Sequence, residues 1–267
     1  MATNKLPPKD YENNPFFIAS NGFTLLFNMA RGVGVFLLFL SLFAFIFSYG
    51  INNDDLTSAQ REVTVWHTSD WAIAIGTAAI LGLAFVMIAS LFNGIAAYTA
   101  VQLSKGKRVS FNEAFNAVFE RLWSYIWLKV IISIKLLLWY LLLIVPGIIM
   151  SVRYSLADLA FFDERKNLRG NAAIKESLRL TKGAWLTTFA ASTLFNLLTF
   201  GSITYVVTTA ANAMLYKQFD TLGDKKPDAH WLSWFTVLFP IVFVTAIFMA
   251  IVLIVVGIGL VGRGFYS

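Results

Sequence analysis

The stretch from residue 123 to residue 162 reads WSYIWLKVIISIKLLLWYLLLIVPGIIMSVRYSLADLAFF. Its first part, residues 123–144, is almost wholly apolar, and at about 1.5 Å per residue a helix of this length crosses roughly 30 Å of hydrocarbon. Val145-Pro146-Gly147 then interrupts the pattern, because proline lacks a backbone N–H and glycine tolerates a sharp turn. The stretch therefore predicts a helical hairpin in a membrane, with Pro146 and Gly147 as its structural hinge.

The second half of this hairpin, residues 148–162, carries charges within an apolar segment. Seven large apolar residues favour its insertion by roughly 3.5 kcal/mol in total, whereas Arg153 and Asp158 cost about 2.5–3.5 kcal/mol each near a helix centre. Alone, the segment should not insert. We expect it at membrane depth because its charges face other helices or a wet cavity, and a re-entrant segment is the alternative.

The composition of the whole chain points in the same direction. Hydrophobic residues make up 58% of the 267 residues and charged residues 13%, against about 45–50% and about 25% in soluble domains. This excludes a soluble enzyme and a disordered chain, because too few charges remain to cover a water-facing surface. The absence of cysteine excludes disulfides, thiolate nucleophiles and Cys-ligated metals. With only His67 and His230 as imidazoles, we expect no metal and no cofactor.

Working outward from the hairpin, the hydropathy pattern predicts an all-α fold, a polytopic transmembrane helical bundle of about six spans. A polar N-terminal tail, residues 1–15, precedes a single membrane domain, residues 16–267. The expected spans are residues 32–49, 71–98, 123–144, 148–162, 185–216 and 231–261. Segments starting near Phe16, Ser110 and Asn171 each have one apolar face, which is typical of interfacial amphipathic helices. Ser110 and Glu113 have the spacing of a capping box.

The distribution of Lys and Arg predicts the orientation. Six spans place residues 1–31, 99–122, 163–184 and 262–267 on one side, and these segments hold fourteen Lys and Arg. The opposite side holds four, which are Arg61, Lys217, Lys225 and Lys226. By the positive-inside rule both termini are expected in the cytoplasm, in a cell inner or plasma membrane. Because the basic residues flank membrane spans, no nucleic-acid partner is expected.

Residues 141–185 carry a family resemblance. The sequence has Pro146-Gly147, then Arg153-Tyr154 and Asp163-Glu164, followed by an Ala-x-x-x-Ser-x-x-Leu-x-x-Gly run at Ala173, Ser177, Leu180 and Gly183, with Trp185 opening the next span. This pattern resembles a group of prokaryotic integral membrane proteins that includes the glycerophosphoryl diester phosphodiesterase membrane domain and related membrane domains of unknown function. The resemblance implies a six-span layout. In the phosphodiesterases a separate soluble domain carries the catalytic chemistry, so no enzyme activity is implied for this chain.

The charges inside the hairpin are the first candidate functional residues. Lys129 is expected about 9 Å and Asp158 about 6 Å from the same membrane edge, so the two can pair across the hairpin. Lys135 and Arg153 are expected near mid-depth without a carboxylate at their level. One interpretation is structural: Arg153 bonds carbonyls near Pro146-Gly147 or reaches Asp158, while Lys135 extends toward the interface. The other is a basic cavity for an anion or a lipid head group.

The segment after the hairpin supplies the expected cytoplasmic interface. Its residues are Asp163, Glu164, Ser177, Arg179, Lys182 and Gly183, the last of which lets an interfacial helix turn into the next span. Two functions follow from this sequence. The first is a non-enzymatic membrane protein that organises membrane lipids or serves as an accessory or scaffold subunit, by self-association or with other membrane proteins. The second is a small transporter or channel for an anionic solute or lipid, using Lys129, Lys135, Arg153 and Asp158.

Overall fold

The computed structural model describes residues 11–50, 68–199, 201–223, 226 and 228–264, and all regular structure in these ranges is α-helical. The helices are α1 (Pro15–Met29), α2 (Arg31–Gly50), α4 (Thr68–Ser104), α5 (Phe111–Phe119), α6 (Leu122–Leu142), α7 (Ile144–Tyr154), α8 (Ala157–Phe162), α9 (Asn171–Leu180), α10 (Trp185–Leu198), α11 (Thr204–Leu222) and α12 (Trp231–Gly264). The predicted all-α class is confirmed for this part of the chain. Most of the predicted tail, residues 1–10, and the predicted outer-loop residues Arg61, His67 and Lys225 lie outside the described residues.

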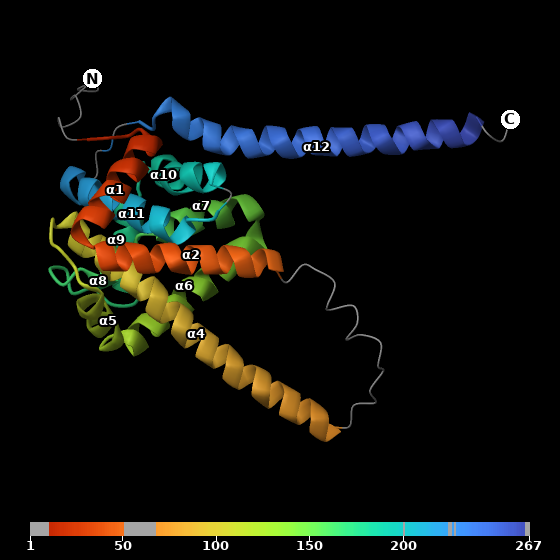
Figure 1. The fold of residues 1–267 in the computed structure, drawn as a ribbon. Coiled ribbons are helices and arrows are strands. Elements are labelled where there is room, and N and C mark those ends of the chain that lie inside the picture. Colours follow the sequence, from red (N-terminus) through yellow and green to blue (C-terminus); the bar gives the residue numbers. More distant parts are fainter. Residues whose placement is uncertain (1–10, 51–67, 200, 224–225, 227, 265–267) are drawn as a thin grey trace.

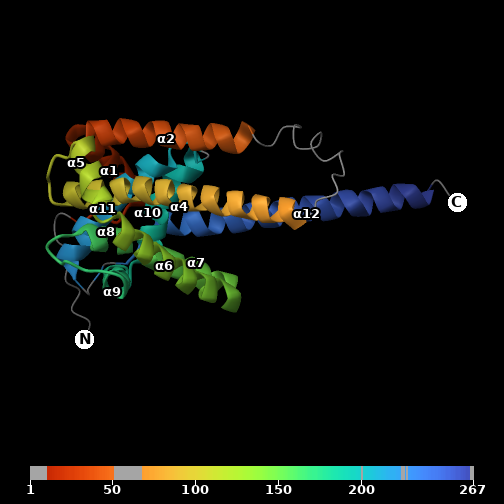
Figure 2. The same ribbon diagram turned by 90° about the horizontal axis from the view of Figure 1, so that it is seen from below.

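The helices meet in a compact body from which longer helices extend. Helices α1, α5, α8, α9 and α11 gather at one end of the molecule, while α2, α4, the α6–α7 hairpin and α12 project from it in the same general direction (Figures 1 and 2). We call the outer part of α4, residues 71–88, and helix α12 the arms. The compact body holds the buried residues, and the arms stand largely apart from it.

Helix α11 lies at the centre of the compact body, where α1 packs closely along it. Helix α1 begins after an N-cap, Asn14, whose side chain accepts a hydrogen bond from the Phe16 N–H, and Pro15 is the first helical residue. A Cβ on Gly22 would lie 2.3 Å from the backbone oxygen of Ala210, so this contact requires glycine. Helix α1 is therefore fixed to α11 through its backbone, with Ile18 and Leu26 also buried.

Three described helical segments are long and apolar enough to cross a membrane, namely Ile73–Ser104, Leu122–Leu142 and Ile144–Phe162. Two shorter apolar segments, Arg31–Ile46 and Thr245–Ile254, lie within α2 and α12. Only 6% of the most apolar part of the first segment is buried inside the protein, against 44% of the third. The chain therefore has the apolar helices of a membrane protein, and some of them have little protein around them.

The hairpin of α6 and α7 forms, but its hinge differs from the prediction. The helical backbone breaks at Leu143, which is extended at φ −163° and ψ 147°. Pro146 and Gly147 instead lie in the first turn of α7, where a missing N–H costs no helical hydrogen bond. Gly147 has a packing role, since a Cβ there would meet the ring of Tyr140 at 2.3 Å.

The predicted span over residues 185–216 is not one continuous helix, because the structure divides this region into α10 and α11. Gly201 has φ +80° in the connection between them, a backbone conformation that glycine adopts readily. Helix α11 returns to the compact body, where Asp220 meets Arg165 and Lys166. The following segment stays there: Lys226 donates to the carbonyls of Arg179, Lys182 and Gly223. The loop predicted on the opposite side thus lies beside α9.

This return also sets the direction of the last helix. Helix α12 begins at the compact body and carries the chain away from it, so that its far end lies well away from α1 (Figure 1). At the compact body, the Asn13 side chain donates to the carbonyl of Asp228 at 3.1 Å, near the start of α12. The expectation of both termini on one side followed from treating residues 185–216 as one helix. With two helices there, the last segment reverses its direction.

Candidate functional site

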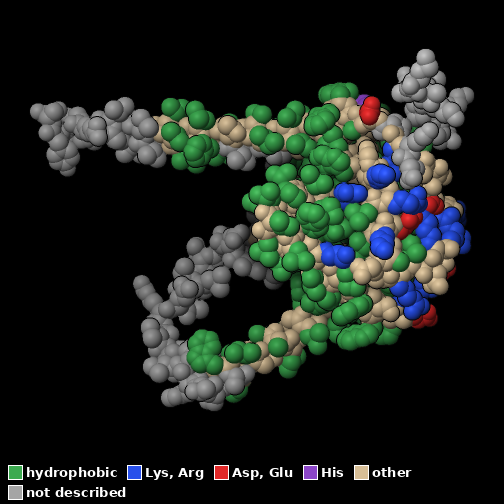
Figure 3. Space-filling view, turned by 180° about the vertical axis from the view of Figure 1, so that it is seen from behind, with side chains coloured by type: hydrophobic (Ala, Val, Ile, Leu, Met, Phe, Trp, Pro, Cys, Tyr) green, Lys and Arg blue, Asp and Glu red, His purple; other side chains and the backbone are tan. Residues whose placement is uncertain are grey.

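On the face that Figure 3 shows, charged side chains gather toward the end of the compact body away from the arms, whereas hydrophobic side chains predominate on the side that faces the arms. We call this region the charged end. It is formed by the end of α4, the loop after α8, helix α9 and the end of α11. The residues of this region come from parts of the sequence that are far apart, so only the fold brings them together.

Asp163, which follows α8 directly, is the centre of the charged end. Its side chain is 0% exposed, and it forms a salt bridge with Lys105, whose Nζ lies 3.0 Å from Asp163 Oδ1. Arg165 donates to both carboxylate oxygens, from Nε at 3.2 Å and from Nη2 at 3.0 Å. The hydroxyl of Tyr216 donates to Oδ2 at 2.9 Å. The carboxylate thus binds donors from the turn directly after α4, from its own loop and from α11.

These donors decide the charge state of Asp163. Burial alone raises the pKa of a carboxyl group, but the hydrogen bonds from Arg165, Lys105 and Tyr216 outweigh it and hold the pKa of Asp163 well below its usual range. The group is therefore ionised at neutral pH. A buried charge of this kind is stable only while its partners remain in place.

A second carboxylate pair extends the network to α9. Lys166 Nζ lies 2.7 Å from Glu176 Oε1 and 2.6 Å from Asp220 Oδ1, so it bridges α9 and α11. Arg179 donates to both oxygens of Glu176 at 2.7 and 2.8 Å. The hydrogen bonds from Arg179 and then Lys166 lower the pKa of Glu176 to about 2, against the opposing effect of burial. The network joins every element of the charged end.

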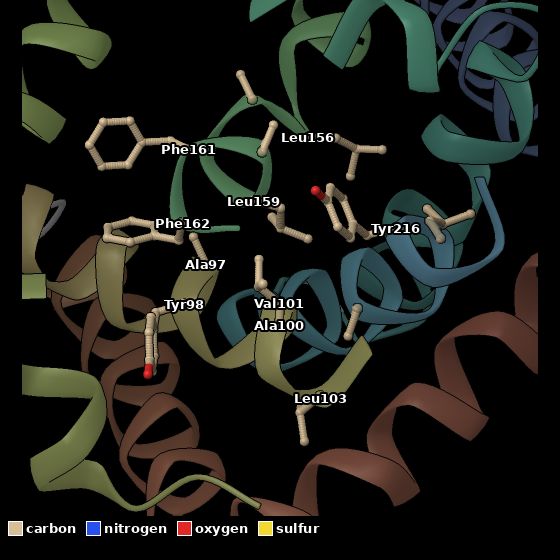
Figure 4. Packing of buried hydrophobic residues seen from close by; sticks show 14 of the residues in the cluster. Ala97, Tyr98, Ala100, Val101, Leu103, Leu156, Leu159, Phe161, Phe162 and Tyr216 are labelled. Carbon is tan, nitrogen blue, oxygen red and sulfur yellow. The ribbon is translucent and has the colours of Figure 1, made fainter. Parts of the chain in front are cut away.

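Hydrophobic packing lies directly beneath these charges. Figure 4 shows residues of α4, such as Ala97 and Val101, facing Leu159 of α8, with Tyr216 of α11 beside them. The ring of Phe162 packs edge-on against Tyr98 at 6.2 Å between centroids and lies 5.1 Å from Tyr125. These buried rings hold the end of α8 in place and so position Asp163, the next residue.

The charged end is hollowed beside Asp163. A cavity of about 430 Å³ is lined by Ser104, Lys105, Lys107, Glu164, Arg165, Tyr216, Lys217, Asp220 and Thr221. Four of these side chains are cations and two are carboxylates, so the lining is basic overall. Lys217 and Asp220 belong to this end because α11 returns to it.

The predicted pair of Lys129 and Asp158 is present in the structure. Lys129 Nζ lies 2.5 Å from Asp158 Oδ2, across the hairpin. The other carboxylate oxygen, Oδ1, is buried and accepts no hydrogen bond within the described part of the chain. Asp158 is also one of the residues around a polar cavity of about 330 Å³ between α4, the α7–α8 connection and α11, lined by Asn93, Ala96, Ala97, Ala100, Ser155, Asp158, Leu159, Thr204, Tyr205, Thr208, Thr209 and Asn212.

Arg153 and Lys135 do not join this pair. Arg153 Nη2 donates to the carbonyl of Leu178 at 3.3 Å, which is neither of the two partners expected from the sequence. The Arg153 carbonyl in turn accepts from Ser177 Oγ at 2.7 Å and Thr181 Oγ1 at 3.3 Å. Arg153 therefore fixes α9 against α7. Lys135 has no ion pair with any residue that the structure describes.

The remaining predicted interface residues have smaller roles. Glu164 is exposed and pairs with Arg121 at 3.5 Å. Gly183 has φ +76° in the turn between α9 and α10, as its predicted turning role requires. Lys182 is exposed, and its carbonyl accepts from Lys226. At the start of α5, Ser110 Oγ accepts from the Glu113 N–H, while the Glu113 carboxylate accepts from Tyr98 instead of closing the capping box.

The sequence did not identify Lys105 and Tyr216 as partners of Asp163, or Asp220 as a partner of Arg165 and Lys166. The first two lie 58 and 53 residues from Asp163 along the chain, and no local pattern connects them. One signal was available: residues 185–216 are about 48 Å long as a helix, far more than a bilayer requires. A break there would have returned Tyr216 and Asp220 to the charged end.

Comparisons with models of protein families, with curated proteins and with solved structures find no match to this chain. The resemblance of residues 141–185 to the glycerophosphoryl diester phosphodiesterase membrane domain stays a prediction.

Proposed function

We propose that this chain is a non-enzymatic integral membrane protein that organises membrane lipids or serves as a scaffold or accessory subunit for other membrane proteins. One observation carries the proposal. Along the outer part of α4, residues 71–88, large apolar side chains stand exposed on all sides, with Ile80 and Phe85 each 71% exposed. Such a surface is not stable in water, so it requires lipid or another apolar helix around it.

The structure favours a topology that differs from six spans. Helix α10 has 14 residues and is about 21 Å long, which is short of roughly 30 Å of hydrocarbon. We therefore propose five crossings, by α2, α4, α6, α7 with α8, and α12, together with a hairpin of α10 and α11 that enters and returns. Buried backbone at membrane depth is tolerated in such a hairpin because protein surrounds it.

The charged end lies, in this proposal, on the cytoplasmic side of a cell inner or plasma membrane. Lys105, Arg165, Lys166 and Arg179 are all at this end, and the return of α11 adds Lys217. The positive-inside rule then gives the orientation more strongly than the predicted topology did. Membrane lipids, further copies of the chain or other membrane proteins are the proposed partners, and nucleic acid is not.

Purification in mild detergent tests this function directly. Mass spectrometry of the purified protein should detect bound phospholipid or a partner protein in fixed ratio to the chain. In liposomes, the same protein should cause no solute flux above that of empty liposomes. Solute flux into liposomes that depends on the protein, and that a single substitution in the protein abolishes, would contradict the proposal.

A second function, a small transporter or channel, has one observation in its favour. The polar cavity beside Asp158 contains hydroxyl and amide groups from α4 and α11, and the carboxylate of Asp158 lies in its lining, within a segment apolar enough to cross a membrane. If the cavity carried a solute, Asp158→Asn would abolish flux in liposomes, whereas Glu164→Gln at the exposed charged end would not. Equal behaviour of the two variants would exclude this use of the cavity.

A further inference from the structure

A groove of about 490 Å³ lies where α6 begins, apart from the two cavities described above. Its lining comes from Trp123, Ser124, Ile126 and Trp127 of α6 and from Arg169 and Gly170, just before α9. Trp123 is 76% exposed and Trp127 63% exposed. Two large aromatic side chains, four residues apart on one helix face, thus stand open to the surroundings.

The opposite face of α6 explains why these tryptophans remain exposed. Tyr125 and Leu128 are fully buried in the compact body, so the helix cannot turn its tryptophans inward. The apolar segment that can cross a membrane begins at Leu122. Trp123 and Trp127 therefore lie at one end of a span, the depth at which tryptophan is enriched in membrane proteins because its ring is apolar and its N–H is polar.

Arg169 gives the groove its charge. It is the one ionisable side chain among the six lining residues. Its neighbours Arg165 and Lys166 are held by Asp163, Asp220 and Glu176, whereas Arg169 forms no ion pair with any residue that the structure describes. A guanidinium that is free to bind, beside apolar rings at a membrane edge, matches a phosphate group joined to acyl chains.

We propose that this groove binds an anionic glycerophospholipid, with its phosphate on Arg169 and its glycerol and upper acyl chains against Trp123 and Trp127. The inference rests on the proposed membrane function and names the lipid class and the site. Free inorganic phosphate would satisfy Arg169 alone and would leave both tryptophans uncovered. The combined lining therefore favours the lipid.

Native mass spectrometry of the delipidated protein with added phosphatidylglycerol or phosphatidylcholine tests the site. The unmodified protein should bind phosphatidylglycerol about tenfold more tightly, because its head group has a net negative charge that Arg169 can neutralise, whereas the choline cation already balances the phosphate of phosphatidylcholine. Arg169→Gln should remove this preference. Lys175→Gln, which changes an exposed cation on α9 outside the groove, should keep it.

The tryptophans have a matched control in the same experiment. Trp127→Leu should weaken binding of both lipids, whereas Trp231→Leu, at the exposed start of α12, should leave binding unchanged. An unchanged melting temperature in each variant shows that the fold is intact. A lipid preference that survives Arg169→Gln overturns the site, as does displacement of phosphatidylglycerol by millimolar inorganic phosphate.

The outcomes separate the site from the function. If the unmodified protein binds neither lipid, the proposed lipid function fails together with the groove. If the Arg169→Gln variant binds phosphatidylglycerol as well as the unmodified protein does, the proposed function stands and the assignment of this groove is wrong.

Discussion

The charged end and the arms differ in how their side chains are accommodated: the charged end buries charges that are paired within the chain, whereas the arms expose apolar side chains. At the charged end, Asp163 is fully buried and each of its oxygens accepts from groups of the same chain. On the arms, Ile80 of α4 and Leu253 of α12 are about two-thirds exposed or more, with no described neighbour covering them. The charged groups of the charged end find their partners within the chain, whereas the apolar surface of the arms must be covered by lipid or by another protein.

The contacts that stabilise the compact body come from the chain itself, whereas the contacts around the arms must come from the membrane. Ion pairs within the compact body link α4, α9 and α11, so this region keeps its geometry by contacts that the sequence itself encodes. The residues of the arms that the structure describes form no ion pairs of this kind, so lipid or another helix must cover their apolar side chains. We therefore expect stability to respond to changes at the charged end and association to respond to changes on the arms.

The largest effect on stability is expected at Asp163. Asp163→Asn keeps the size of the side chain but leaves the nearly buried Lys105 without its counter-charge, which should cost about 3–5 kcal/mol. Thermal unfolding in mild detergent measures the loss. Glu164→Gln removes a neighbouring exposed carboxylate and should cost about 1 kcal/mol or less. Equal losses in the two variants would mean that the Asp163 network does not stabilise the compact body.

The pair of Lys129 and Asp158 should show direct coupling inside the hairpin. Lys129→Met and Asp158→Asn each leave a partly buried charge unpaired, so the double variant should lose less than the sum, with a coupling of about 1–2 kcal/mol. Lys135→Met is the control, because Lys135 is not paired with Asp158, and its effect should add to that of Asp158→Asn. If the stability losses of Lys129→Met and Asp158→Asn were also additive, the ion pair between Lys129 and Asp158 would be contradicted.

Gly22 tests the packing beneath the charges. A Cβ at this position meets the backbone of Ala210, which cannot move aside without displacing α11, so Gly22→Ala should cost about 1–3 kcal/mol. Gly82→Ala, on the arm of α4, meets no atom within 4 Å and should be neutral or stabilising by up to about 1 kcal/mol. The melting temperatures of the two variants should therefore move in different directions, and a parallel fall would argue against the contact of α1 with α11.

The pH dependence should be a smaller effect and confined to acid. The pKa of Glu176 is about 2 in the folded chain and 4.5 without its partners, so between these values the unfolded chain binds more protons. Stability is then fully present above about pH 4.5 and is lost as pH falls toward 2, with Asp163 contributing in the same direction. Glu176→Gln should reduce this acid-dependent loss in a series of melting curves. Glu120→Gln, at an exposed carboxylate, should leave the loss unchanged.

Local patterns in the sequence predicted local structure well. The N-terminal cap at Ser110, the turn at Gly183 and the pair of Lys129 and Asp158 each depend on short spacing or on one hairpin, and all three are present. The buried faces of α9, with Ile174 and Ser177, also follow from the helical period. Such features require no knowledge of distant contacts.

Most of the contacts at the charged end that the sequence did not predict depend on one long-range feature of the fold, the return of α11 to the compact body. Hydropathy does not distinguish a long tilted helix from a short hairpin of two apolar helices, so the break near Gly201 was not expected. Once α11 returns, Tyr216 reaches Asp163 and Asp220 reaches Lys166. The hinge at Leu143 was missed for another reason: proline was assumed to break a helix, although it is tolerated in a first turn.

The return of α11 to the charged end is the central claim, and cysteine labelling across the membrane tests it most directly. The chain has no cysteine, so Lys175→Cys on α9 and Thr221→Cys at the end of α11 each introduce a single exposed thiol. With a membrane-impermeant maleimide, both should be modified in inverted vesicles, and both should be protected in right-side-out vesicles until these are lysed. Modification of the two cysteines from opposite sides of the membrane would show that residues 185–216 cross it once, and would contradict the account.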